Sequence, residues 1–150
     1  MKKFFFTLQS VFKYKLTVEK LQKADLTRAE NLVRELREKE RKINEDLART
    51  GAERDEALKK RTDIIRELEE YDIYFQYLRG TKKKLAAEIE KAERVRDACR
   101  VKLLATMKEL KTYRKLREDQ YRQYLRECAT EEEKETGDLV SFSVVSGAGK

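Results

Sequence analysis

The chain has no proline, tryptophan or histidine, and only five glycines and two cysteines in 150 residues. Without proline, no position is forced to break a helix. Without histidine, the side chain most suited to proton transfer and metal binding at neutral pH is missing. Cys99 and Cys128 stand in no metal-binding or redox motif and predict a reducing compartment. These absences argue against a catalytic or metal centre, so we expect no enzyme activity and no cofactor.

Long apolar runs are also missing. No stretch approaches the roughly 18 apolar residues of a membrane span. The opening Met1-Lys2-Lys3-Phe4-Phe5-Phe6 is similar to the start of a signal peptide, but Gln9, Lys13 and Lys15 interrupt it and no cleavage site follows. We therefore expect a cytoplasmic protein.

Charge dominates what is present, since 43% of the residues are charged. Among them, one apolar series keeps alternating steps of four and three from Ile64 to Tyr124, which is the pattern of a helix packed on another helix. The series is Ile64, Leu68, Tyr71, Phe75, Leu78, Lys82, Leu85, Ile89, Ala92, Arg96, Cys99, Leu103, Thr106, Leu110, Tyr113, Arg117, Gln120 and Tyr124.

A second series occupies the first third of the chain. Its positions are Leu8, Val11, Lys15, Val18, Gln22, Asp25, Ala29, Leu32 and Leu36, widened by Leu16, Leu21, Leu26 and Val33. Between Leu36 and Ile43 the step is four plus three rather than three plus four, which predicts a four-residue stutter. Together the two series predict an all-α fold, an antiparallel two-helix coiled-coil hairpin.

The apolar series pauses between Leu47 and Ile64, where Gly51 opens the gap and Thr62 or Asp63 can cap a new helix. We expect helix 1 at about 7–50, the turn at about 51–62 and helix 2 at about 63–131. Gly80 is the alternative turn. A turn at 51–62 would bring Leu8 near residues 105–112. The hairpin forms one domain, 1–135, and 136–150 is expected to be a flexible tail or a short partner-binding strand.

Net charge varies along the chain. Residues 82–126 carry 15 basic and 7 acidic side chains, whereas 127–150 carry 2 and 6. A basic stem favours an acidic protein partner or a polyanion, or is simply a solvated helix surface. Basic and acidic residues alternate at short spacing, which argues against nucleic acid as the partner.

Two groups of aromatic residues exceed what one helix seam requires. Tyr71, Tyr74, Phe75, Tyr77 and Leu78 lie close together, and Tyr113, Tyr121 and Tyr124 lie where helix 2 outruns helix 1. Tyrosine is favoured at protein interfaces, so both groups are candidate partner-binding surfaces. The alternative for the first group is that it fills a thicker part of the core.

The opening Phe4 to Lys15 (FFFTLQSVFKYK) and the motif Glu67, Leu68, Tyr71, Tyr74, Phe75 and Leu78 (E-L-x-x-Y-x-x-Y-F-x-x-L) resemble the FliJ family of flagellar export proteins and its YscO-type relatives in virulence secretion. A basic second helix with an acidic end also fits. The resemblance implies a non-enzymatic antiparallel stalk of a type III export apparatus.

The same resemblance implies the partners. They would be the export ATPase hexamer, the cytoplasmic domain of the export gate, and export chaperones, with the protein peripheral to the inner membrane through protein contacts. Tyr71, Tyr74, Phe75 and Leu78 would face the gate. The segments from Phe4 to Phe12 (with Leu8 and Val11) and from Tyr113 to Tyr124 would face the ATPase. The alternative function is a generic coiled-coil adaptor or scaffold, which would self-associate and stimulate no ATPase.

Overall fold

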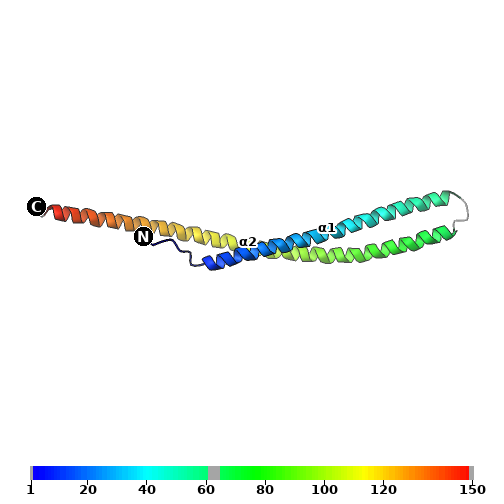
Figure 1. The fold of residues 1–150 in the computed structure, drawn as a ribbon, viewed down its shortest axis with the longest axis horizontal. Helices are drawn as coiled ribbons and strands as arrows, with labels where there is room; N and C mark the ends of the chain where they lie inside the picture. Colours follow the sequence, from blue (N-terminus) through cyan, green and yellow to red (C-terminus); the bar gives the residue numbers. More distant parts are fainter. Residues whose placement is uncertain (1, 61–64, 149–150) are drawn as a thin grey trace. The chain divides into compact units, whose positions relative to one another are not determined.

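The computed structural model describes residues 2–60 and 65–148 and contains two long helices. Helix α1 spans Gln9–Lys59 and helix α2 spans Ile65–Ala148 (Figure 1). The predicted all-α hairpin is confirmed. Contacts divide the chain into two units, one of Leu21–Leu103 and one that joins Met1–Lys20 to Leu104–Lys150.

In the unit of Leu21–Leu103, α1 and α2 lie antiparallel. A buried cluster of Val33, Leu36, Leu85, Ile89 and Ala92 joins them, with Ile43 packed against it. Three ion pairs fix the direction, because residue numbers rise on α1 as they fall on α2. They are Glu30–Arg100 at 3.7 Å, Arg37–Glu93 at 2.5 Å and Arg54–Asp72 at 3.3 Å.

The other unit has its own core. Phe6, Phe12 and Leu110 are buried together, and Phe4, Leu8, Leu16 and Tyr113 pack against them. Leu8 therefore packs against the cluster that contains Leu110, which lies within the predicted range of 105–112. Lys15 reaches Glu109 at 2.6 Å. This hydrogen bond raises the pKa of the Lys15 ammonium, so Lys15 remains charged at neutral pH.

The predicted α2 series matches the buried side of that helix. Leu78, Leu85, Ile89, Ala92, Leu103, Thr106 and Leu110 are buried, and most other positions of the series are half-buried. Lys82 and Arg117 are the exposed positions of the series among the described residues. Ile64 lies outside those residues.

The positions of α1 that face α2 differ in part from the predicted series. Buried and half-buried positions follow steps of four and three without interruption at Leu8, Phe12, Lys15, Glu19, Gln22, Leu26, Ala29, Val33, Leu36, Glu40, Ile43, Leu47, Thr50, Arg54 and Ala57. Val11, Asp25 and Leu32 are exposed instead. The predicted stutter is wrong because the half-buried Glu40, paired with Arg37 at 3.3 Å, holds the intermediate step.

The end of α1 also differs, since the helix continues to Lys59 instead of ending near residue 50. Gly51 does not begin a turn: its position faces the Phe75 ring, and a Cβ there would lie 3.9 Å from Phe75 Cζ. Buried Thr50 and Ala57 carry the helix pairing onward. The predicted caps Thr62 and Asp63 lie outside the described residues. The alternative turn at Gly80 is wrong, because Gly80 lies inside α2.

The C-terminal segment is helical as well. Helix α2 runs to Ala148, not to about residue 131, so the described part of the predicted flexible tail is an exposed helix. Glu131, Glu132, Glu133, Lys134 and Glu135 favour helix, and no proline follows. Once a helix exists, each added residue gains a hydrogen bond at little cost, which explains the extension.

Replacing Gly51 or Gly80 by alanine should stabilise the chain by about 1 kcal/mol each, because both glycines lie in helix interiors. The new Cβ at position 51 makes an ordinary contact with Phe75, and the Cβ at position 80 meets no atom within 4 Å. Urea unfolding measured by circular dichroism gives the change. A loss of stability in Gly51→Ala would show that residue 51 is not helical.

Candidate partner-binding surfaces

The first candidate surface, here called the tyrosine patch, consists of Tyr71, Tyr74, Phe75, Tyr77 and Leu78 on α2. The structure separates its members into two layers. Leu78 is buried, and Tyr71 and Phe75 are half-buried in the seam against α1. Tyr74 and Tyr77 point away from the seam and are 40% and 66% exposed. The exposed pair is therefore not needed to fill the core.

The two exposed rings lie next to each other and nearly parallel. The Tyr74 and Tyr77 ring centroids lie 6.4 Å apart with an interplanar angle of 25°. Ile73 adds an exposed aliphatic side chain beside them on the same helix. Sequence reasoning missed Ile73, although an isoleucine off the apolar series is the signal that could have found it. Stacked rings bury a large area at little entropic cost when a partner binds.

Neighbouring groups set the chemistry of this patch. The Arg79 guanidinium lies 5.8 Å from the centre of the Phe75 ring and contributes a positive charge. Burial, and next the negative charge of Glu67, raises the pKa of the Tyr71 hydroxyl. Tyr71 thus remains a neutral hydrogen-bond donor at neutral pH. The patch combines apolar rings, one cation and phenol hydroxyl groups.

The second candidate surface, here called the terminal cluster, consists of Phe4, Leu8, Phe12, Tyr113, Tyr121 and Tyr124. The structure brings these predicted residues together in one unit. Phe4 contacts Tyr121 edge to face at 5.1 Å and Tyr124 at 5.6 Å between ring centroids. Leu8, Phe12 and Tyr113 belong to the core beneath them. Val11, also predicted, is 40% exposed on α1 and is not one of the buried core residues.

The extended N-terminal segment is attached to α2 by specific contacts. The Tyr124 hydroxyl donates a hydrogen bond of 2.7 Å to the Lys2 carbonyl. The neighbouring Cys128 thiol, and next burial, raises the pKa of Tyr124, so its hydroxyl keeps the proton that it donates. Phe6 is 3% exposed and Phe5 is 77% exposed. Inward Phe4 and Phe6 alternate with outward Phe5 along this non-helical segment, a signal that sequence reasoning did not use for Phe6.

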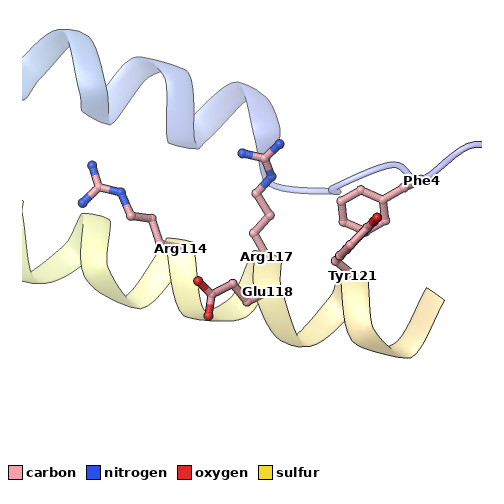
Figure 2. Close-up of a pocket in the computed structure, with 5 residues that line it drawn as sticks. All are labelled: Phe4, Arg114, Arg117, Glu118 and Tyr121. Atoms are coloured by element: carbon pink, nitrogen blue, oxygen red, sulfur yellow. The ribbon is translucent and has the colours of Figure 1, made fainter. Parts of the chain in front are cut away.

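A shallow groove lies on the terminal cluster. Phe4, Arg114, Arg117, Glu118 and Tyr121 line it, and its volume is about 340 Å³ (Figure 2). In Figure 2 the Phe4 and Tyr121 rings close one end, and Arg114 and Arg117 extend from α2 toward α1. The Arg114 guanidinium lies 6.0 Å from the centre of the Phe12 ring. The groove therefore offers rings and positive charge together.

The basic character extends along α2. A second hollow of about 740 Å³ is lined by Lys108, Lys111, Thr112, Arg114, Lys115, Glu118, Asp119 and Arg122. Elsewhere, several cations are paired with carboxylates of their own helix: Arg41 pairs with Glu38 and Glu45, and Arg94 pairs with Glu90. The excess of cations over carboxylates around the hollow favours an anionic partner.

Within 2–60 and 65–148, no three His, Cys, Asp or Glu side chains converge to hold a metal ion. Cys99 is half-buried and Cys128 is buried, both as free thiols. Across that part of the chain, neither helix has a stretch long and apolar enough to cross a membrane. What the arrangement does offer is exposed surface for recognition.

Comparison with known proteins gives one match. A family model described as flagellar FliJ protein matches residues 15–147. No curated protein and no solved structure gives a significant match to the chain.

Removing the Tyr124 hydroxyl in Tyr124→Phe should release the N-terminal segment, because the hydrogen bond to the Lys2 carbonyl is lost. We expect trypsin to cleave after Lys3 roughly threefold to tenfold faster, the effect of one net hydrogen bond. Tyr121→Phe is the matched control, since its ring contact with Phe4 remains. Equal cleavage rates in the two variants would contradict this anchoring role.

Proposed function

The chain belongs to the FliJ family of flagellar proteins, and we propose that it is a non-enzymatic stalk that couples the export ATPase to the export gate. The family is a component of the flagellar type III protein-export apparatus, and the match covers most of the chain. The partners and the surfaces that bind them are the finer part of the proposal. They rest on the two candidate surfaces described above.

The observation that carries the proposal is the exposure of Tyr74 and Tyr77 on a helix whose seam is already filled. Leu78 and the half-buried Tyr71 and Phe75 complete the contact with α1, so the stacked pair is left for another molecule. Desolvated tyrosine and arginine side chains supply much of the binding energy in protein interfaces. We assign the tyrosine patch to the export gate.

The terminal cluster is assigned to the export ATPase ring. Its groove presents Phe4 and Tyr121 beside Arg114 and Arg117. Exposed charges in water contribute little binding energy each, and they allow a partner to engage and release. Such contacts suit a stalk held inside a ring. Export chaperones are further partners of the proposal, and the site of action is the cytoplasmic face of the membrane, reached through protein contacts.

The test is to mix the purified chain with the export ATPase and to follow ring assembly and the hydrolysis rate. We expect both to increase with the chain present. Phe4→Ala with Tyr121→Ala should reduce the increase, because it removes the aromatic wall of the groove. An unchanged rate and no complex with the unmodified chain would leave a coiled-coil scaffold as the better account.

The tyrosine patch gives a separate prediction. Tyr74→Ala with Tyr77→Ala should weaken binding to the gate domain by about 10- to 100-fold, the effect of losing one or two interface anchors. Helicity and melting temperature should not change, because both side chains lie outside the core. Calorimetric titration measures the affinity.

Val95→Ala is the matched control for the patch, since Val95 is an exposed apolar residue of α2 outside it. The double variant should also still stimulate the ATPase. A marked fall in melting temperature would show instead that the two tyrosines support the fold.

A further inference from the structure

The C-terminal part of α2 carries a second regular series, most of which is left exposed by the pairing with α1. Within it, Arg114 lies over the Phe12 ring of α1 and Tyr121 contacts Phe4. The positions of this series follow steps of three and four from residue 104 to 142. Along the seam, each position comes one residue after a position of the predicted α2 series. The series, here called the outer stripe, is Leu104, Met107, Lys111, Arg114, Glu118, Tyr121, Leu125, Cys128, Glu132, Glu135, Leu139 and Phe142.

Most of the outer stripe is open. Its large apolar side chains, Leu104, Met107, Tyr121, Leu125, Leu139 and Phe142, are between 40% and 72% exposed. Cys128 is the buried member. From residue 129 to 147, every residue of α2 is exposed, so this length of helix packs against no other element. An exposed helix with apolar residues at regular spacing is typical of an interaction surface.

The order of residue types along the outer stripe is self-complementary. Reflection about Gln123 places Leu104 opposite Phe142, and Met107 opposite Leu139. The same reflection places Lys111 opposite Glu135, and Arg114 opposite Glu132. At the centre, Tyr121 meets Leu125. Glu118 and Cys128 form the one pair without complementary chemistry.

We propose that the outer stripe binds the outer stripe of a second copy of this chain, with the two α2 helices antiparallel across a two-fold axis near Gln123. A two-fold interface uses the same surface on both copies, so residue i meets j and j meets i. This requirement is met by the reflected order of charges and apolar groups. Each dimer would contain the pairs Lys111–Glu135 and Arg114–Glu132 twice.

Electrostatics favour the antiparallel arrangement over the parallel one. Parallel pairing in register would place Lys111 against Lys111 and Glu132 against Glu132, and like charges at an interface are repulsive. The apolar pairs at the two ends supply buried area, while the charged pairs select the direction. The existing groove lies on this stripe, because Arg114, Glu118 and Tyr121 are among its lining residues.

Sedimentation equilibrium of the full chain over a concentration series tests the proposal. We expect a reversible equilibrium between the mass of one chain and the mass of two. The dimer should weaken as salt concentration rises, because exposed ion pairs are screened. A single-chain mass at every concentration would overturn the proposal. Binding of an acidic peptide would not rescue it, because the proposed partner is a second copy of the chain.

Charge exchange makes the test specific. Lys111→Glu with Arg114→Glu gives an acidic variant, and Glu132→Lys with Glu135→Lys gives a basic one. Each variant alone should raise the dissociation constant of its own dimer by about tenfold or more, because two attractive pairs become repulsive on each half. An equimolar mixture should form a heterodimer, since all four charged pairs are then attractive again.

The matched control is Arg126→Glu with Lys134→Glu, which changes net charge as the acidic variant does. Both residues are exposed and lie off the outer stripe. This control should dimerise like the unmodified chain, and circular dichroism should show equal helicity for every variant. Equal loss of dimer in the control, or no heterodimer in the mixture, would overturn the proposal.

This inference goes beyond the export function and does not depend on it. Self-association is measured on the chain alone, whereas the proposed function is measured as ATPase stimulation and gate binding. Arg114 and Tyr121 belong to both surfaces, so a second copy and the ATPase would compete for this face, and the two outcomes are told apart by which of the two measurements changes.

Discussion

The regular seam between α1 and α2 is the interaction on which the rest of the structure depends. Neither helix carries a wide apolar face. A helix in a protein gains most of its stability from packing its apolar stripe against another element. A small core holds the pairing in each unit. One core includes Val33, Leu36, Leu85 and Ile89, and the other consists of Phe6, Phe12 and Leu110. Residues that the seam does not need are left on the surface, and both candidate binding surfaces consist partly of such residues.

Much of the fold could be predicted from the sequence because a seam has a strict period. The α2 series was predicted correctly, since its steps of four and three continue in one phase from Leu68 to Tyr124. The α1 series was predicted in the wrong phase between Val11 and Leu32, because Leu26 and Val33 were placed beside the seam instead of in it. Glu40 shows the physical limit: a charged side chain can hold a seam position when its carboxylate reaches a cation such as Arg37.

The ends of the helices could not be predicted as well. Gly51 lowers helix propensity locally, but Ala52, Glu53 and Arg54 after it favour helix, and Thr50 and Ala57 on either side of them are buried. The segment after residue 131 has no such packing, and its helix follows from propagation. Of the candidate sites, sequence periodicity separated Tyr74 and Tyr77 from the seam. It could not place Phe6 in the core, because the contact of an extended segment with α2 is not periodic.

Polar groups within the seam favour one register of the two helices at some cost in stability. Among the described residues, Gln22 Oε1 and Arg54 Nε are buried side-chain atoms without a hydrogen-bond partner, and each costs stability. Lys15 satisfies its own position by pairing with Glu109. Since a shifted register would bury such groups against apolar side chains, polar seam positions select one alignment of two otherwise similar charged helices. That alignment is what brings Phe4 to Tyr121 in one unit and Gly51 to Phe75 in the other, so a modest loss of stability fixes where the aromatic surfaces stand.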